Sequence, residues 1–126
     1  MINVSKQILY WQTGADEELL NATIMIENKR FLAGLFFCHL CIEKMLKANV
    51  VKLTENHPSR THNLFWLADA ARIDFNEEQD KFVSTLQVYQ LEGRYPETYP
   101  SEPAAIDAEK LFVQTKNLYI WLKEKL

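Results

Sequence analysis

The segment FLAGLFFCHLCIEKMLKANVVK, residues 31–52, decides the fold class. Its apolar side chains surround almost the whole helical turn instead of forming one stripe. They are Phe31, Leu32, Leu35, Phe36, Phe37, Leu40, Ile42, Met45, Leu46 and Val50. Because a helix that is apolar nearly all round lies inside its protein, we expect residues 31–52 to form a central, buried helix.

A polar row interrupts this apolar surface. His39, Glu43 and Lys47 recur at every fourth residue, so they stack along one line of the helix. Glu before Lys at this spacing is the favourable order for an intrahelical ion pair. The row is either the one solvated strip of the helix or one edge of a cleft, because charged groups on a mostly buried helix must meet water or partners. Lys44 and Lys47 together give it a modest cationic edge.

Two cysteines lie on the same predicted helix. Cys38 and Cys41 share a face, but zinc-binding cysteines usually come with a second ligand pair further along the chain. No second Cys pair follows, although His57 and His62 in the next loop offer nitrogen ligands in principle. Free cysteines are among the most buried residues. We therefore expect both in the core of a reduced, cytoplasmic protein, with no metal site and no cofactor.

The other segments also carry helical periodicity. Apolar residues step by three or four along residues 4–26 and 64–72, and again around residues 82–89 and from about Pro103 onward. Asn63 or Thr61 is the expected N-cap of the third helix, and Asn76 that of the fourth.

The connections between these segments are short and rich in turn residues. Residues 53–63 contain Pro58, and residues 93–103 hold three of the four prolines. No strand-like alternation and no internal repeat occurs. Short loops between long amphipathic helices favour antiparallel neighbours. We predict an all-α, up-and-down antiparallel bundle of about five helices, three long and two shorter, in a single domain of residues 1–126.

Composition restricts the function classes. A formal net charge of −3 gives no global attraction to nucleic acid. The longest apolar-rich stretch, residues 31–42, is too short to span a bilayer, and the N-terminal residues lack the apolar core of a signal peptide. Apolar residues off the main stripes, such as Tyr10, Ile24 and Trp121, indicate a second apolar face, which serves either as further core or as a homodimer interface.

Four motifs in order resemble the HEPN family (higher eukaryote and prokaryote nucleotide-binding domain). They are an aromatic-rich entry, the HxxxEKxLKA core within FFCHLCIEKMLKANV, the step THNLFWL and the turn YQLEGRYPE. The resemblance spans nearly the whole chain. It implies an all-α bundle, often dimeric, that binds nucleotides or a small nucleotidyltransferase encoded beside it, as in toxin–antitoxin pairs.

Many members of this family are ribonuclease toxins that carry an Arg followed, four to six residues later, by a His. In that pair Arg holds a phosphate and His helps to transfer the 2′-hydroxyl proton. Here Arg30, Arg60, Arg72 and Arg94 have no His at that spacing. The nuclease signature of the family is therefore missing.

The resemblance and the polar row together suggest a ligand-binding cleft. Its expected residues are His39, Glu43, Lys44, Lys47, His62, Arg94 and Tyr95. Arg94 either binds a phosphate or carboxylate of a partner, or it bonds loop carbonyls or pairs with Glu43. His62 is either a cap or core-edge residue or a general base, and Tyr95 either anchors the proline turn or stacks on a base.

Two hypotheses about function follow. The first is a non-catalytic module that binds a nucleotide, RNA or a nucleotidyltransferase partner, with no membrane involved. The alternative is a metal-independent endoribonuclease toxin that uses Arg94 with His62 and Glu43. The missing Arg–His spacing and the acidic net charge favour the first.

Overall fold

The computed structural model describes residues 1–126, and every regular element in it is helical. The helices are α1 (Val4–Glu27), α2 (Phe31–Thr54), α3 (Leu64–Ala70), α4 (Glu77–Gln87), the short 3₁₀ helix η1 (Pro96–Thr98) and α5 (Ala105–Lys123). The predicted all-α bundle with three long and two shorter helices is confirmed. The last helix begins at Ala105, two residues later than predicted.

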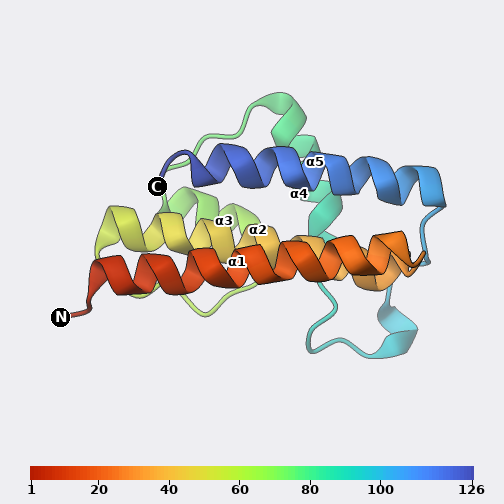
Figure 1. Ribbon diagram of the computed structural model, residues 1–126, viewed down its shortest axis with the longest axis horizontal. Coiled ribbons are helices and arrows are strands. Elements are labelled where there is room, and N and C mark those ends of the chain that lie inside the picture. The colour runs from red at the N-terminus through yellow and green to blue at the C-terminus, as the bar shows by residue number, and fades with distance from the viewer.

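The three long helices run alongside one another. In Figure 1, α1 and α2 form an antiparallel hairpin, and α5 lies along α1 in the opposite direction, so that the two chain termini are at the same end. The shorter α4 crosses this layer steeply (Figure 1), and α3 connects α2 to it. This arrangement brings the middle of α2, the start of α3 and the end of α4 together.

Asparagine side chains begin three of the helices. Asn63 Oδ1 accepts a hydrogen bond from the backbone N–H of Trp66 at 3.1 Å, which caps α3. Asn76 forms a reciprocal capping box with Gln79 at the start of α4. Asn3 caps α1 in the same way as Asn63 caps α3. The caps predicted at Asn63 and Asn76 are thus confirmed, because each satisfies backbone N–H groups that the first turn leaves without partners.

The central position of α2 is confirmed as well. Most of its residues are buried, and the core that surrounds it draws on all five α-helices. Gly34 lies where α2 passes close to α1, and a Cβ at this position would come within 2.6 Å of Ile26 Cδ1.

No helix of the chain combines the length and the apolar character that crossing a bilayer requires.

Candidate functional site

The polar row of α2 points into the protein. His39 is 0% exposed, Glu43 4% and Lys47 7%. The row is therefore not a solvated strip, and that interpretation from the sequence is wrong. Other helices pack around α2, so its polar side chains are buried as well. Buried polar groups need partners inside the protein.

Glu43 is the centre of this buried polar group. One carboxylate oxygen, Oε2, accepts a hydrogen bond from Lys47 Nζ at 3.1 Å. The other oxygen, Oε1, is 2.9 Å from His62 Nδ1 and 3.8 Å from His39 Nδ1. The Lys47 ammonium also lies 5.1 Å from the centre of the Trp11 ring. A buried carboxylate with one full cation and two imidazoles around it satisfies the rule that buried charges are paired.

Gln87, near the end of α4, contacts both histidines. Its Oε1 accepts from the backbone N–H of Leu64 at 2.8 Å. Its Nε2 donates to the His62 carbonyl at 3.0 Å and lies 3.2 Å from His39 Nε2. Gln87 was missed by the reasoning from sequence, since a glutamine at the end of a short amphipathic helix gives no signal of its own.

The two ring nitrogens of His39 have different surroundings. Its Nε2 lies 3.2 Å from the Gln87 amide nitrogen, which can only donate, and 3.1 Å from the His62 carbonyl, which can only accept. Its Nδ1 is buried and has no hydrogen-bond partner, because the Glu43 carboxylate is 3.8 Å away. A proton on Nε2 can be donated to the His62 carbonyl, whereas a proton on Nδ1 makes no hydrogen bond.

His39 carries no charge in this environment. Burial is the main cause that lowers the pKa of His39, from its usual 6.5 to about 4, against the opposing attraction of Glu43. The imidazole is therefore neutral at pH 7, and Lys47 is the one full cation inside the buried group.

His62 lies at the boundary between this buried group and solvent. Its side chain is 42% exposed, and its Nδ1 donates to Glu43. The opposite ring nitrogen, Nε2, lies 3.5 Å from Glu92 Oε2. The carboxylate of Glu43 thus holds the ring in one orientation, a role that carboxylates commonly have beside histidines.

A polar hollow of about 480 Å³ lies beside His62, and we call it the His62 hollow. It is lined by Thr61, His62, Asn63, Gln87, Gln90, Glu92 and Arg94. The structure thus brings His62 and Arg94 to one cavity, with Glu43 beneath it. Gln90 and Glu92 were not identified from the sequence, because only the fold of the 88–95 segment places them there.

Arg94 is bound to the backbone of its own loop. Its guanidinium donates to the carbonyls of Val88 and Gln90, each at 3.1 Å, and to the carbonyl of Thr98. Of the roles considered for Arg94 in holding the fold, the bonds to loop carbonyls are the ones observed, and the pair with Glu43 is not. Tyr95 follows it with 74% of its surface exposed, and it does not line the His62 hollow.

Lys44 lies at a different place. Its Nζ pairs with Glu18 at 2.9 Å, and its stem passes Gly14 on α1. It lines a separate hollow that also includes Tyr10 and Glu17. Of the seven residues expected at one cleft, three are buried, Lys44 and Tyr95 lie outside the His62 hollow, and His62 and Arg94 line it together.

The two cysteines belong to the core, as predicted. Cys38 and Cys41 are both fully buried and not joined to each other. Burial raises the pKa of the Cys38 thiol to about 11, against a small opposing effect of its hydrogen bond with Thr115. A protonated, inaccessible thiol is a poor nucleophile and a poor ligand. No group of three or more His, Cys, Asp or Glu side chains is placed to hold a metal ion.

Comparison with known proteins identifies the family of the chain. No curated protein matches it. Among solved structures, the crystal structure of TT1696 from Thermus thermophilus is similar, with a TM-score of 0.78 and 20% sequence identity. The match covers 95% of this chain and 98% of that one, which shows a shared fold. The sequence model of the HEPN domain matches residues 8–126. The chain therefore belongs to the HEPN domain family and is a helical module of a nucleotide- or RNA-related kind.

Proposed function

We propose that this HEPN domain is a non-catalytic binding module that acts with a partner, a small nucleotidyltransferase, in a toxin–antitoxin type of pair. The observation that supports this best is that both basic side chains at the His62 hollow are held by hydrogen bonds within the protein. His62 is held by Glu43 at 2.9 Å, and the Arg94 guanidinium is held by three backbone carbonyls. A rigid, hydrogen-bonded wall of this kind suits recognition of a partner's polar groups.

The electrostatics of the hollow favour a protein partner over RNA or a nucleotide phosphate. Glu92 lies 3.5 Å from the free nitrogen of His62, and no lysine lines the hollow. A phosphate entering here would meet this carboxylate, and the formal charge of the whole chain is −3. The partner itself is suggested by the resemblance to HEPN proteins that accompany nucleotidyltransferases. A homodimer, also suggested by that resemblance, is compatible with this function.

One observation favours the second candidate, a metal-independent endoribonuclease that uses Arg94 with His62 and Glu43. A buried carboxylate that orients an imidazole at the edge of a hollow resembles the arrangement of a general base, although Glu92 lies 3.5 Å from the other nitrogen. Arg94 lines the same cavity and would be the phosphate ligand. For this role the Arg94 guanidinium has to give up hydrogen bonds to backbone carbonyls, or use the N–H groups that these hydrogen bonds leave free.

The test is expression of the chain alone and together with the product of a neighbouring nucleotidyltransferase gene. The measurements are growth, integrity of total RNA and co-purification of the two proteins. We expect no growth arrest and intact RNA from the chain alone, and a complex that His62→Ala weakens. His57→Ala, in the exposed loop before α3, is the matched control and should leave the complex intact.

Growth arrest with RNA degradation by the wild type would contradict the non-catalytic function if Arg94→Ala and His62→Ala abolish both effects. Arg60→Ala is the control for loss of an arginine outside the hollow. If the partner binds His62→Ala as tightly as the wild type, the His62 hollow is not the contact surface.

A further inference from the structure

Most hydrogen-bond donors that line the His62 hollow are already engaged within the protein. Gln87 Nε2 donates to the His62 carbonyl at 3.0 Å, and Gln90 Nε2 donates to the Glu92 carbonyl at 3.2 Å. Arg94 donates to three backbone carbonyls of its own loop. A ligand that brings only acceptors therefore finds few partners in this hollow.

Two acceptors of the hollow, in contrast, receive no hydrogen bond from the chain. Gln90 Oε1 is buried in the wall and has no hydrogen-bond partner. The side chain of Glu92 is 59% exposed, and its ion pair with His62 Nε2 is 3.5 Å long, which is too long for a good hydrogen bond. A buried acceptor without a donor costs free energy. The His62 hollow therefore favours a ligand that supplies donors.

The ring of His62 adds a further reason for a donor at Glu92. Its Nδ1 donates to Glu43 at 2.9 Å, so in the neutral ring Nε2 turns a lone pair toward Glu92 Oε2. Two acceptors that face each other at this distance repel unless a proton lies between them. A second proton on the ring supplies it, and so does a cationic N–H group that reaches both atoms.

The charges of the hollow also favour a cation at Glu92. Arg94 brings one positive charge, but its N–H groups are directed at carbonyl oxygens of its loop. Glu92 has no comparable partner and remains exposed. A guanidinium suits this position better than an ammonium, because it is more weakly hydrated and its planar N–H groups match a carboxylate.

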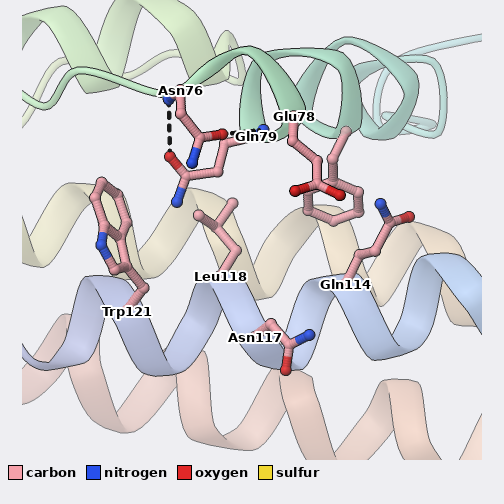
Figure 2. A pocket seen from close by; sticks show the side chains of 8 residues that line it. Asn76, Glu78, Gln79, Gln114, Asn117, Leu118 and Trp121 are labelled. Carbon is pink, nitrogen blue, oxygen red and sulfur yellow. Dashed lines mark hydrogen bonds between the residues drawn. The ribbon is translucent and has the colours of Figure 1, made fainter.

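The hollow of about 310 Å³ between α4 and α5 has the opposite balance of donors and acceptors. Figure 2 shows the Glu78 side chain there, together with the amides of Asn76 and Gln79. Asn76 Oδ1 accepts from the Gln79 N–H at 2.7 Å, and Gln79 Oε1 accepts from the Asn76 N–H at 3.0 Å. These amides keep donors and not acceptors, so the α4–α5 hollow is a suitable comparison site that also contains a carboxylate.

We propose that the His62 hollow receives an arginine side chain of the protein partner. Its guanidinium pairs with the Glu92 carboxylate and supplies the donor that Gln90 Oε1 lacks. Arginine is enriched at protein interfaces, and it binds carboxylates through two parallel N–H···O bonds. The inference rests on the proposed function for the identity of the partner, a small nucleotidyltransferase, and it adds the chemistry of the contact.

The first experiment tests the site without the partner. The full chain is titrated with Nα-acetyl-arginine amide and, as the uncharged ligand of the same shape, Nα-acetyl-citrulline amide. We expect saturable shifts of the Gln90 side-chain amide and the Glu92 backbone signal in ¹H–¹⁵N spectra with the arginine ligand alone. Glu92→Gln should weaken this binding at least threefold. Glu78→Gln, which removes the carboxylate of the α4–α5 hollow, should bind like the wild type.

The second experiment uses the complex with the nucleotidyltransferase. Glu92→Lys should weaken it at least tenfold, Glu78→Lys should not, and one Arg→Glu exchange in the partner should restore binding to Glu92→Lys. If the arginine ligand binds but no complex forms, the proposed function fails and the arginine site is confirmed. The inference is overturned if the arginine ligand gives no saturable shifts, if the citrulline ligand binds equally well, or if Glu92→Lys leaves a His62-dependent complex intact.

Discussion

Glu43 connects the buried polar side chains of α2 with His62. Its carboxylate lies beside three basic side chains, namely His39, Lys47 and His62, and two of these three are buried with it. In a low-dielectric interior such a group is stable only while every member has its partner. Glu43 is therefore both a structural residue and the group that sets the chemistry of His62.

Replacing Glu43 by Gln should destabilise the fold by about 3 kcal/mol, because Lys47 then keeps a buried charge without a counter-ion. Urea unfolding measures this loss. Glu92→Gln is the control: Glu92 is largely exposed, so its loss should cost well under about 1 kcal/mol. Equal costs for the two variants would show that the Glu43–Lys47 pair is not what stabilises α2.

The neutral state of His39 predicts how stability depends on pH. Its pKa is lowered by burial from 6.5 to about 4 in the folded chain, so between these values the unfolded chain binds a proton that the folded chain does not. The stability that comes from the neutral His39 is complete above pH 6.5 and is lost as the pH falls toward 4. The free energy of unfolding should decrease by about 3 kcal/mol over this range from His39 alone.

The pH effect is measured as the difference in urea unfolding between the wild type and His39→Gln across this range. Proton NMR gives a second reading on the wild type, in which the His39 ring signals should remain those of a neutral imidazole down to about pH 5. Titration of these signals near pH 6.5 would contradict the buried, neutral His39.

At the scale of elements, the close approach of α1 and α2 depends on two glycines that differ in their surroundings. A Cβ at Gly34 would lie 2.6 Å from Ile26 Cδ1 and 2.9 Å from its Cγ1, inside the core. A Cβ at Gly14 would lie 3.1 Å from Lys44 Cδ, part of a flexible and partly exposed side chain. The same substitution should therefore have opposite signs at the two sites.

Gly14→Ala should stabilise the chain by about 0.5–1 kcal/mol, because alanine is the better helix former and the Lys44 stem can move aside. Gly34→Ala should destabilise it by about 1 kcal/mol, because overpacking against Ile26 outweighs the same helical gain. Thermal or urea unfolding of both variants decides this. In the Gly34→Ala background, Ile26→Val should recover part of the loss, and no recovery would contradict the steric cause.

At the scale of the whole molecule, α1 and α5 both carry exposed apolar side chains. Leu20 on α1 is 60% exposed, and Ile106 and Ile120 on α5 are 77% and 51% exposed. The two helices lie side by side, joined through the hydrogen bond of Tyr119 to Asp16 (Figure 1). Exposed apolar side chains are typical of protein interfaces where they form a contiguous patch.

The homodimer expected from the sequence therefore stays a prediction with a defined location. Light scattering on the purified chain should give twice the chain mass of 14.8 kDa. Leu20→Lys should yield monomers by placing a charge in the interface. Leu53→Lys, at a residue of similar exposure on α2, should not. A wild type that is monomeric throughout would refute the interface.

Periodicity and local hydrogen bonding along the chain were enough to predict the helical content and the central position of residues 31–52. They also predicted the caps at Asn63 and Asn76 and the burial of Cys38 and Cys41. These features depend on residues a few positions apart, so the sequence carries them directly. The HEPN family was also readable from motifs along the chain.

The surroundings of the polar residues, in contrast, came from tertiary packing. Helical spacing shows that His39, Glu43 and Lys47 share a face, but whether that face meets water depends on the helices packed against it. His62 and Gln87 reach Glu43 and His39 from segments 19 and 48 residues away in sequence. Such partners are set by how α3 and α4 pack on α2, because the free energy of a buried charge depends on every group around it and not on its own helix alone.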